Sequence, residues 1–459
     1  MKKVSVKQLN LMLFLRRFGL ICVGAIIVFA ACIDKMALPP GLGSDIGFSA
    51  GDTTYLRVNP VWGEEYGFQS PVEISIGQDG YVFIADSAGH SIFVLEQDGD
   101  IPDGFSSLRE LTYNETYIAP IDVDIDNKMN VLFIDGSQQI FCWNQLWNHV
   151  GIQAIAVSGV FFNEAYGDSG VEHDTETWRQ FANESSWSLA ETVWDSSGLK
   201  IDSLLALRLI YDGALTRYNY PDVYYASEES EFSGLSAIEG PADGFYVTDK
   251  YHNRILRIRW LRTDRIRLNT GEEIWVHDGV FDHIVEDYGT GAGTVNQPTG
   301  IDVDYAGQIY YTQSGEFFGV HKLKPNNAQY PSVFQPGVNN IMDLDRYNRP
   351  QDVAVDANQI IYVANTDAQE IQVFDSGGQF FRKVGVQDII VDTTMTVING
   401  TDTTTVDTFY TREVKGLLEE PRAVTVDNRG VVYVVDTPMR RIVRYRLSNQ
   451  LDENLNPVE

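Results

Sequence analysis

Cysteine is scarce in this chain of 459 residues, which contains only Cys22, Cys32 and Cys142. Cys22 lies within an N-terminal apolar run and Cys32 ends it, so Cys142 is left without a partner for a disulfide. A disulfide framework is therefore excluded, and a hydrophobic core must hold the fold together. Hydrophobic residues make up 44% of the chain and charged residues 21%, which is sufficient for a large core.

Basic residues are also few, because 34 Lys and Arg stand against 64 Asp and Glu, for a net charge of −30. The first 31 residues hold basic residues and no acidic ones, so the remainder is more acidic still. Such a field repels phosphate backbones and anionic lipid headgroups. The composition therefore argues against nucleic acid as a partner.

Familiar catalytic motifs are missing as well. The sequence contains no His-Glu-x-x-His, no cysteine pair with metal-ligand spacing, no Gly-x-Ser-x-Gly and no phosphate-binding loop. This absence favours binding over catalysis, although it leaves the question of an enzyme open.

The N-terminus combines a basic region with a short apolar stretch. Residues 1–17 contain five Lys or Arg, and the apolar stretch runs from Phe18 to Ala31. That stretch is shorter than the about 20 residues that a membrane-spanning helix requires, and it ends in small residues, as a secretory signal does before its cleavage site. We therefore predict that residues 1–31 are a signal peptide.

The end of the apolar stretch, Phe29-Ala30-Ala31-Cys32, resembles the bacterial lipobox, although Phe29 replaces the usual aliphatic residue. The resemblance implies a lipoprotein that is anchored to the membrane at Cys32 in the bacterial cell envelope and faces the periplasm or the cell exterior. The alternative is an uncleaved anchor helix with an incidental cysteine. Residues 32–52 are rich in proline and glycine and are predicted to be a flexible tether.

Six copies of one pattern follow the tether. Each begins with a proline or Phe232, continues with alternating aliphatic residues and a turn, and ends a second segment in Asp or a related residue. In the five copies that begin with proline, this end residue lies 15 positions on, and from Phe232 it lies 17 positions on, at Asp249. The copies begin at Pro71, Pro120, Phe232, Pro298, Pro350 and Pro421.

Each copy predicts a small antiparallel meander, because its first segment alternates with a period of two. A sheet with two apolar faces cannot bury both alone, whereas a radial arrangement buries each sheet against its neighbours. The sequence therefore predicts an all-β fold, a six-bladed β-propeller, over residues 53–449, with a polar tail at 450–459.

Four stretches carry a family resemblance. Ala85–Ile92 and Thr248–Ile255 look like the NHL repeat, in which an Asp, a short turn and an Asn-His-Arg-Ile-like strand start follow one another. Pro298–Asp304 and Pro350–Asp356 resemble its Pro-x-Gly-Ile-Ala-Val-Asp opening. The resemblance covers residues 71–447 outside the insertions. It implies the propeller fold but not a function, because the family includes substrate-binding domains of ligases, scaffolds and a few enzymes.

The last copy ends near Leu447 after its third strand, so its sheet lacks a fourth strand. Thr54–Val58 is a suitable strand at the other end of the body. We therefore predict that this N-terminal strand closes the ring, since an open edge would otherwise remain.

Three insertions interrupt the repeats. Residues 147–231 are rich in aromatics and too long for a structureless loop; Ser203–Leu215 is apolar enough for a helix, and a degenerate seventh blade is the alternative for the region. Asp388–Lys415 is rich in threonine and predicts a hairpin with its turn at Asn399-Gly400. A second hairpin is predicted over Arg265–His277.

Histidines are few and do not form a pattern typical of zinc. His90 and His252 occupy the turn of the repeat, where we expect them to fix the start of the next strand. His277 and His283 flank an acidic loop, a loose arrangement for a metal. The seven histidines are His90, His149, His173, His252, His277, His283 and His321.

The third residue of each copy is predicted to lie at the mouth of the axial channel, where the innermost strands begin. It is acidic in three copies, at Glu73, Asp122 and Asp352, where the family often has glycine. Since hard divalent ions favour oxygen ligands, these residues predict a site for a cation such as calcium. A solvated acidic rim is the alternative, and Arg422 is predicted to face the same mouth, where it would neutralise the carboxylates.

Together these features favour a lipid-anchored, extracytoplasmic, non-catalytic binding or scaffold protein. It would engage a protein, peptide or glycan through the propeller face and the aromatic insertion. The alternative is a metal-assisted propeller enzyme of the lyase or lactonase type. Such a lyase needs converging histidines, and no three repeats here place histidine at the channel mouth.

Overall fold

The computed structural model divides into two units, Met1–Thr53 and Thr54–Glu459, and all the residues that it describes belong to the second unit. The signal peptide, the tether, Cys32 and the tail at 450–459 lie outside the described residues. No helix in the described part is long and apolar enough to span a membrane. The described ranges are 54–102, 107–113, 116–127, 130–144, 208–212, 230–238, 244–267, 273–327, 329–399, 402–414 and 417–448.

Six antiparallel sheets form the blades, and each copy of the repeat supplies the first strands of one blade. The innermost strands are β2 (Pro71–Ile76), β7 (Asp122–Ile125), β11 (Phe232–Ala237), β15 (Pro298–Val303), β18 (Pro350–Val355) and β24 (Pro421–Val426). The second strands are β3 (Val82–Asp86), β8 (Asn130–Ile134), β12 (Phe245–Asp249), β16 (Ile309–Gln313), β19 (Ile361–Asn365) and β25 (Val432–Asp436).

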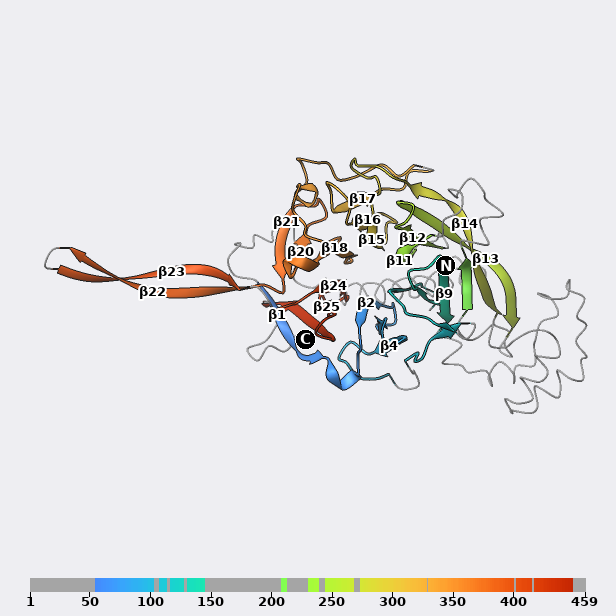
Figure 1. Ribbon diagram of the computed structural model, residues 1–459, viewed down its shortest axis with the longest axis horizontal. Helices are drawn as coiled ribbons and strands as arrows, with labels where there is room; N and C mark the ends of the chain where they lie inside the picture. The colour runs from blue at the N-terminus through green and yellow to red at the C-terminus, as the bar shows by residue number, and fades with distance from the viewer. Residues whose placement is uncertain are drawn as a thin grey trace, which may run out of the picture. The chain divides into compact units, whose positions relative to one another are not determined.

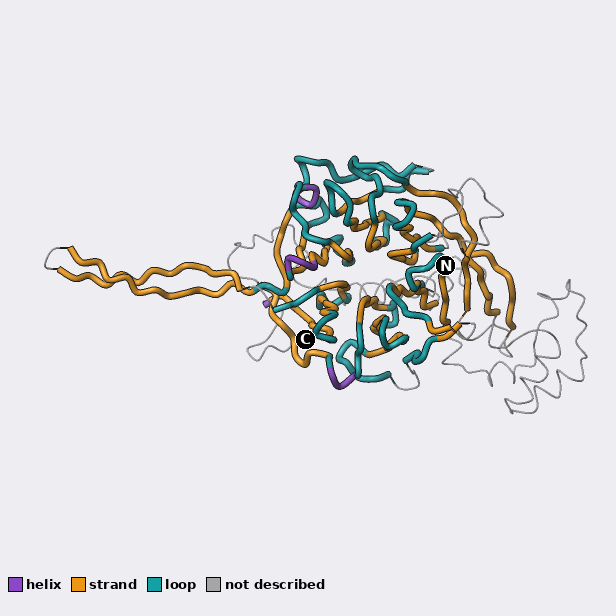
Figure 2. Tube along the Cα trace, viewed as in Figure 1, coloured by secondary structure: helices purple, strands orange, loops and turns teal. Residues whose placement is uncertain are grey.

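The outer strands differ more between blades. The third strands are β4 (Ser91–Leu95), β9 (Gln139–Asn144), β13 (Arg254–Arg267), β17 (Val320–Leu323), β20 (Glu370–Phe374) and β26 (Arg441–Leu447). In the described part of the chain four blades have a fourth strand, and these strands are β10 (Arg208–Asp212), β14 (Glu273–Glu286), β21 (Phe380–Val384) and β1 (Tyr55–Trp62). The short pair β5 (Thr112–Tyr113) and β6 (Thr116–Tyr117) and the 3-10 helices η1 (Glu64–Tyr66), η4 (Asn340–Met342) and η5 (Thr366–Ala368) lie in connections (Figure 2).

The innermost strands form a closed ring around an axis (Figure 1). They contact one another in the order β2, β7, β11, β15, β18, β24 and back to β2. The six-bladed propeller is therefore confirmed. The alternative of a seventh blade within residues 147–231 is wrong, because β7 and β11 are direct neighbours and leave no place between them.

The N-terminal strand closes the ring as predicted. β1 pairs antiparallel with β26, from Tyr55 opposite Leu447 to Trp62 opposite Ile442, with an irregularity between Val58 and Trp62. The strand is longer than the predicted Thr54–Val58, and the large side chain that it adds, Trp62, is fully buried.

The hydrophobic core lies between the blades. Each of the apolar clusters joins side chains of two neighbouring blades, as when Ile74 and Phe93 of the β2 blade pack with Tyr433 and Ile442 of the β24 blade. Because both faces of each sheet are covered in this way, the second strands are buried along their whole length. This packing is the physical reason for the ring.

The insertions give mixed outcomes. The helix expected over Ser203–Leu215 is wrong where the structure describes that segment, since Arg208–Asp212 forms β10 at the edge of β9. A short apolar run fits either structure by its pattern, and the open edge of β9 decides for a strand. The rest of 147–231 up to Glu229 lies outside the described residues.

Both hairpins are confirmed. β13 pairs with β14 through the segment predicted over Arg265–His277. β22 (Gln387–Asn399) and β23 (Asp402–Val414) pair only with each other in the described part of the chain and extend away from the ring (Figure 1). Asn399 pairs with Asp402 and is the last residue of β22. The prediction that Asn399 belongs to the turn, as part of Asn399-Gly400, is therefore wrong.

Candidate binding sites of the propeller

The propeller has two faces, which we define by the innermost strands. These strands begin at the upper face and end at the lower face. The end residue of the second strand lies at the upper face and anchors the loop before its own blade. In the β2 blade the Asp86 carboxylate accepts hydrogen bonds from the backbone N–H groups of Gln69 (2.6 Å) and Ser70 (2.8 Å). The equivalent contacts in other blades involve Asp249, Gln313, Asn365 and Asp436. The end residue also pairs with the first residue of its copy in the strand ladder, as Asp86 does with Pro71, so the offset of 15 residues is the length of the first two strands and their turn.

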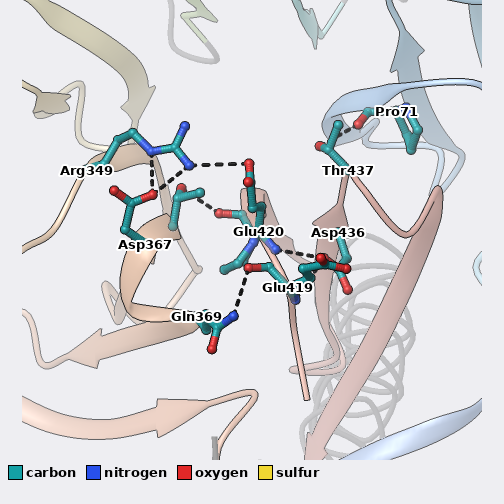
Figure 3. A network of polar contacts seen from close by, with 10 residues as sticks. Pro71, Arg349, Asp367, Gln369, Glu419, Glu420, Asp436 and Thr437 are labelled. Atoms are coloured by element: carbon teal, nitrogen blue, oxygen red, sulfur yellow. Dashed lines mark hydrogen bonds and ion pairs between the residues drawn. The ribbon is translucent and has the colours of Figure 1, made fainter. Parts of the chain in front are cut away.

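Hydroxyl groups link neighbouring blades at the same face. The Thr437 hydroxyl donates to the Pro71 carbonyl (2.7 Å), and the Thr366 hydroxyl donates to the Pro421 carbonyl (2.7 Å). Arg349 adds ion pairs to Asp367 and Glu420 in this region (Figure 3). These contacts hold the loops of the upper face against the blades.

His90 and His252 have the structural roles that the repeat predicts. His252 Nδ1 lies 2.8 Å from Asp249 Oδ2, and Arg254 Nε donates to the same oxygen at 2.9 Å. Burial tends to raise the pKa of Asp249, but the His252 hydrogen bond and the Arg254 charge outweigh it, and the net pKa is lowered. His90 Nδ1 lies 3.0 Å from the Ile118 carbonyl. Both histidines brace loops.

The other described histidines also have structural partners. His283 contacts Asp282 and the Tyr330 hydroxyl. His321 is fully buried, accepts a hydrogen bond from the Gly293 N–H, and has its pKa lowered to about 4 by burial. His149, His173 and the His277 side chain lie outside the described residues. No histidine cluster of the kind that a propeller lyase needs forms among the described residues.

Glu73, Asp122 and Asp352 converge on the channel, as the repeat register predicts. Burial raises the pKa of Glu73 well above its usual value, and the nearby Asp352 and Asp122 carboxylates raise it further. The charge of Arg422 acts in the opposite direction and lowers that pKa, although burial and the carboxylates outweigh it. A cavity of about 60 Å³ is lined by the three acidic residues.

Hydrogen bonds to the backbone occupy these carboxylates. Asp352 accepts from its neighbour Val353 N–H and, across the blade boundary, from Val424 N–H (2.8 Å). Asp122 accepts from Leu235 N–H of the next blade (2.9 Å). Among the described residues no group of three His, Cys, Asp or Glu side chains is arranged to hold a metal ion. Cation binding by Glu73, Asp122 and Asp352 stays a prediction, and the observed role of Asp122 and Asp352 is to link blades.

Two channel residues were missed by the sequence reasoning. Asp124 accepts from Ala237 N–H (2.8 Å), and Asp302 accepts from Val355 N–H (2.7 Å), each across a blade boundary. Both stand two positions after the third residue of their copy, so the period of two in a strand places them on the same face. Burial, and then the Asp124 carboxylate, raise the pKa of Asp302 to about 8.

The largest of the cavities described lies at the lower face. It has a volume of about 280 Å³ and is lined by the turns that follow β2, β15 and β24, together with residues deeper in the channel. Ligands were expected at the upper mouth, where the innermost strands begin. The cavity of about 280 Å³ lies instead where these strands end.

A smaller cavity of about 170 Å³ lies at the upper face between the β15 and β18 blades. Its lining includes Phe317, which is 54% exposed, and Tyr347, Arg346 and Arg349. Exposed large apolar side chains recur around this face in the loops of several blades. They are Tyr117, Tyr251, Tyr288, Phe317, Leu344, Leu417 and Met439.

The protein is therefore a six-bladed β-propeller. The NHL repeat family matches residues 347–374, which include the first three strands of the β18 blade. Among curated proteins, Protein brain tumor of Drosophila melanogaster is 29% identical over 118 residues. That match covers 21% of this chain and 11% of the relative, so the chain spans only a small part of the relative's length.

Solved propellers are similar in architecture. A gluconolactonase of Xanthomonas campestris is 10% identical, with 87% of this chain and 91% of that chain covered and a TM-score of 0.43. An inactive virginiamycin B lyase of Staphylococcus aureus with quinupristin is also 10% identical, with coverage of 86% and 99% and a TM-score of 0.41. A nidogen/laminin complex contains a chain that is 11% identical, with coverage of 84% and 85% and a TM-score of 0.37.

Proposed function

We propose that this protein is a non-catalytic binding or scaffold protein of the bacterial cell envelope, held to a membrane by a lipid on Cys32. It engages a protein or peptide through the upper face of the propeller, and the aromatic insertion at 147–231 extends the contact. A glycan is the third class of ligand that the sequence suggests. The observation that carries the proposal is the set of exposed apolar side chains on a braced upper face.

Three features support this use of the upper face. Aromatic and methionine side chains are enriched at protein interfaces, and Tyr251, Phe317 and Met439 are 44%, 54% and 49% exposed. The loops that carry them are fixed by hydrogen bonds to the blades, so little ordering is needed on binding. The cavity beside Phe317 offers a recess for one side chain of a partner.

Site-specific photo-crosslinking in cells tests the proposal. A photoreactive phenylalanine analogue at Phe317 or Tyr251 is expected to give a discrete adduct of higher mass, because these positions would lie within the interface. The matched control is Ile101, which is 67% exposed and lies beyond the turn after β4 at the lower face. The proposal is wrong if neither upper-face position gives an adduct, or if Ile101 gives the same adducts.

A further inference from the structure

The cavity of about 280 Å³ at the lower face is not part of the interface proposed above. It lies at the other end of the channel, and any activity there would be independent of the upper face. Its volume is just below the roughly 300 Å³ at which small-molecule pockets usually begin. It therefore fits a ligand of one ring and not a peptide segment.

Part of the cavity wall consists of polar side chains that the fold does not use. Thr425 and Asn428 come from the β24 blade, and Gln78 and Gln97 from the β2 blade. In the part of the chain that the structure describes, none of these four side chains has a hydrogen-bond partner. One hydroxyl and three amides thus offer several donors and acceptors to the same hollow. Such a wall suits a ligand with many hydrogen-bonding groups.

The four acidic residues of the wall, by contrast, are engaged. Asp124 accepts from the Ser75 hydroxyl and two backbone N–H groups, and Asp302 accepts from two backbone N–H groups. Asp304 accepts from the Gln308 amide and the Tyr310 hydroxyl, and Asp427 accepts from the Arg429 guanidinium and the Tyr433 hydroxyl. Burial raises the pKa of both Asp124 and Asp302, so that of Asp302 reaches about 8 and this group is largely protonated near neutral pH. No Lys, Arg or His is among the described residues that line the cavity. These residues therefore offer hydrogen bonds to a ligand but no cationic partner for an anion.

An aromatic ring stands at the rim. Tyr305 lines the cavity and is 70% exposed, in the turn that follows β15. The face of an aromatic ring provides an apolar surface for the C–H face of a sugar ring. Amides and hydroxyls on one side and an aromatic ring on the other match a molecule that is polar at its edge and apolar on its face.

We infer that the lower-face cavity binds one sugar ring, a neutral polyhydroxylated ligand that is either a free monosaccharide or the end residue of a glycan chain. The ring hydroxyls bond to Thr425, Asn428 and the glutamine amides. The Tyr305 ring covers the apolar face of the sugar.

Titration calorimetry on the full-length protein tests this inference. The probes are glucose, galactose and N-acetylglucosamine, with maltotetraose for a chain end and methylguanidinium for a cation. Thr425→Val removes the hydroxyl and keeps the shape, and Asn428→Ala removes an amide. The matched control is Asn358→Ala in the equivalent turn of the β18 blade, which does not line the cavity.

We expect at least one sugar to bind, and Thr425→Val and Asn428→Ala each to weaken it by about three- to tenfold, the effect of one hydrogen bond. Asn358→Ala should bind as the wild type does. Binding of maltotetraose alone, with the same dependence on the variants, identifies a glycan end as the source. If Asn428→Ala fails to fold, by its circular dichroism, Thr425→Val decides.

The inference is overturned if no sugar binds, if only methylguanidinium binds, or if both cavity variants bind sugar as the wild type does. None of these results tests partner binding at the upper face. Adducts from Phe317 in the crosslinking experiment would persist, so failure here is distinguishable from failure of the proposed function.

Discussion

At the scale of single residues, buried carboxylates along the channel connect neighbouring blades. Asp302 joins the β15 blade to the β18 blade, and Asp352 joins the β18 blade to the β24 blade. Burial is the main reason that their pKa values rise, to about 8 and about 7. Each folded carboxyl therefore holds a proton at pH values where the unfolded chain has lost it, and stability depends on pH.

The direction of this pH dependence follows from the linkage between proton binding and folding. A carboxyl whose pKa is raised in the folded state contributes its full stability below the unfolded pKa, and the contribution is lost as the pH rises through the folded pKa. We therefore expect the free energy of unfolding to fall between about pH 4 and pH 8, by on the order of a few kcal/mol in total. Asp302→Asn removes one titrating group and should flatten this slope.

Urea unfolding at a series of pH values measures the slope. Asp302→Asn should also lose about 1–3 kcal/mol at pH 4, because an amide accepts only one of the two backbone N–H groups. Asp287→Asn, an exposed carboxylate outside the channel, is the control. Equal slopes for wild type and Asp302→Asn would show that Asp302 does not titrate in this range.

At the scale of elements, the short strand β1 contributes to the stability of the ring. It pairs with β26 and buries Tyr55, Val58 and Trp62, so it completes the blade in which the chain ends. Deleting residues 54–62 leaves the edge of β26 unpaired and exposes the core between the β24 and β2 blades. We expect a loss of about 3 kcal/mol or more, which lowers the melting temperature by roughly 4 °C or more for a domain of this length.

Differential scanning calorimetry on the deletion variant checks this expectation. Deleting residues 41–51 from the predicted tether is the matched control, and it should leave the melting temperature unchanged. A deletion of 54–62 that melts like the wild type would mean that ring closure contributes little to stability.

At the scale of the whole molecule, the expected anchor determines where the propeller acts. Cys32 alone follows the small-residue pair at the end of the apolar stretch. Cys32→Ser is therefore expected to release the protein from the membrane fraction or to stall its processing at the size of the precursor. Cell fractionation with immunoblotting measures both, and Cys22→Ser is the control. A Cys32→Ser protein that stays membrane-bound at mature size would contradict lipid anchoring at this residue.

The sequence by itself determined the blades. The constant offset from Pro71 to Asp86, repeated in four more copies, reflects the length of two paired strands and their turn, and such local geometry is readable from spacing. The shared position as third residue of a copy likewise placed Glu73, Asp122 and Asp352 on the channel. The open edge after Leu447 was enough to predict closure by the N-terminal strand.

Only the tertiary structure decided which partners the channel carboxylates have. Whether Asp352 is free to bind an ion depends on the Val424 N–H, which belongs to another blade 72 residues further on. The fate of Arg208–Asp212 likewise depended on the unpaired edge of β9 and not on its own pattern. The cavity at the lower face arises where turns of several blades meet, and no local spacing encodes that meeting. Short-range periodicity thus specifies strands and their faces, whereas the use of each polar side chain depends on the neighbour that closure of the ring brings beside it.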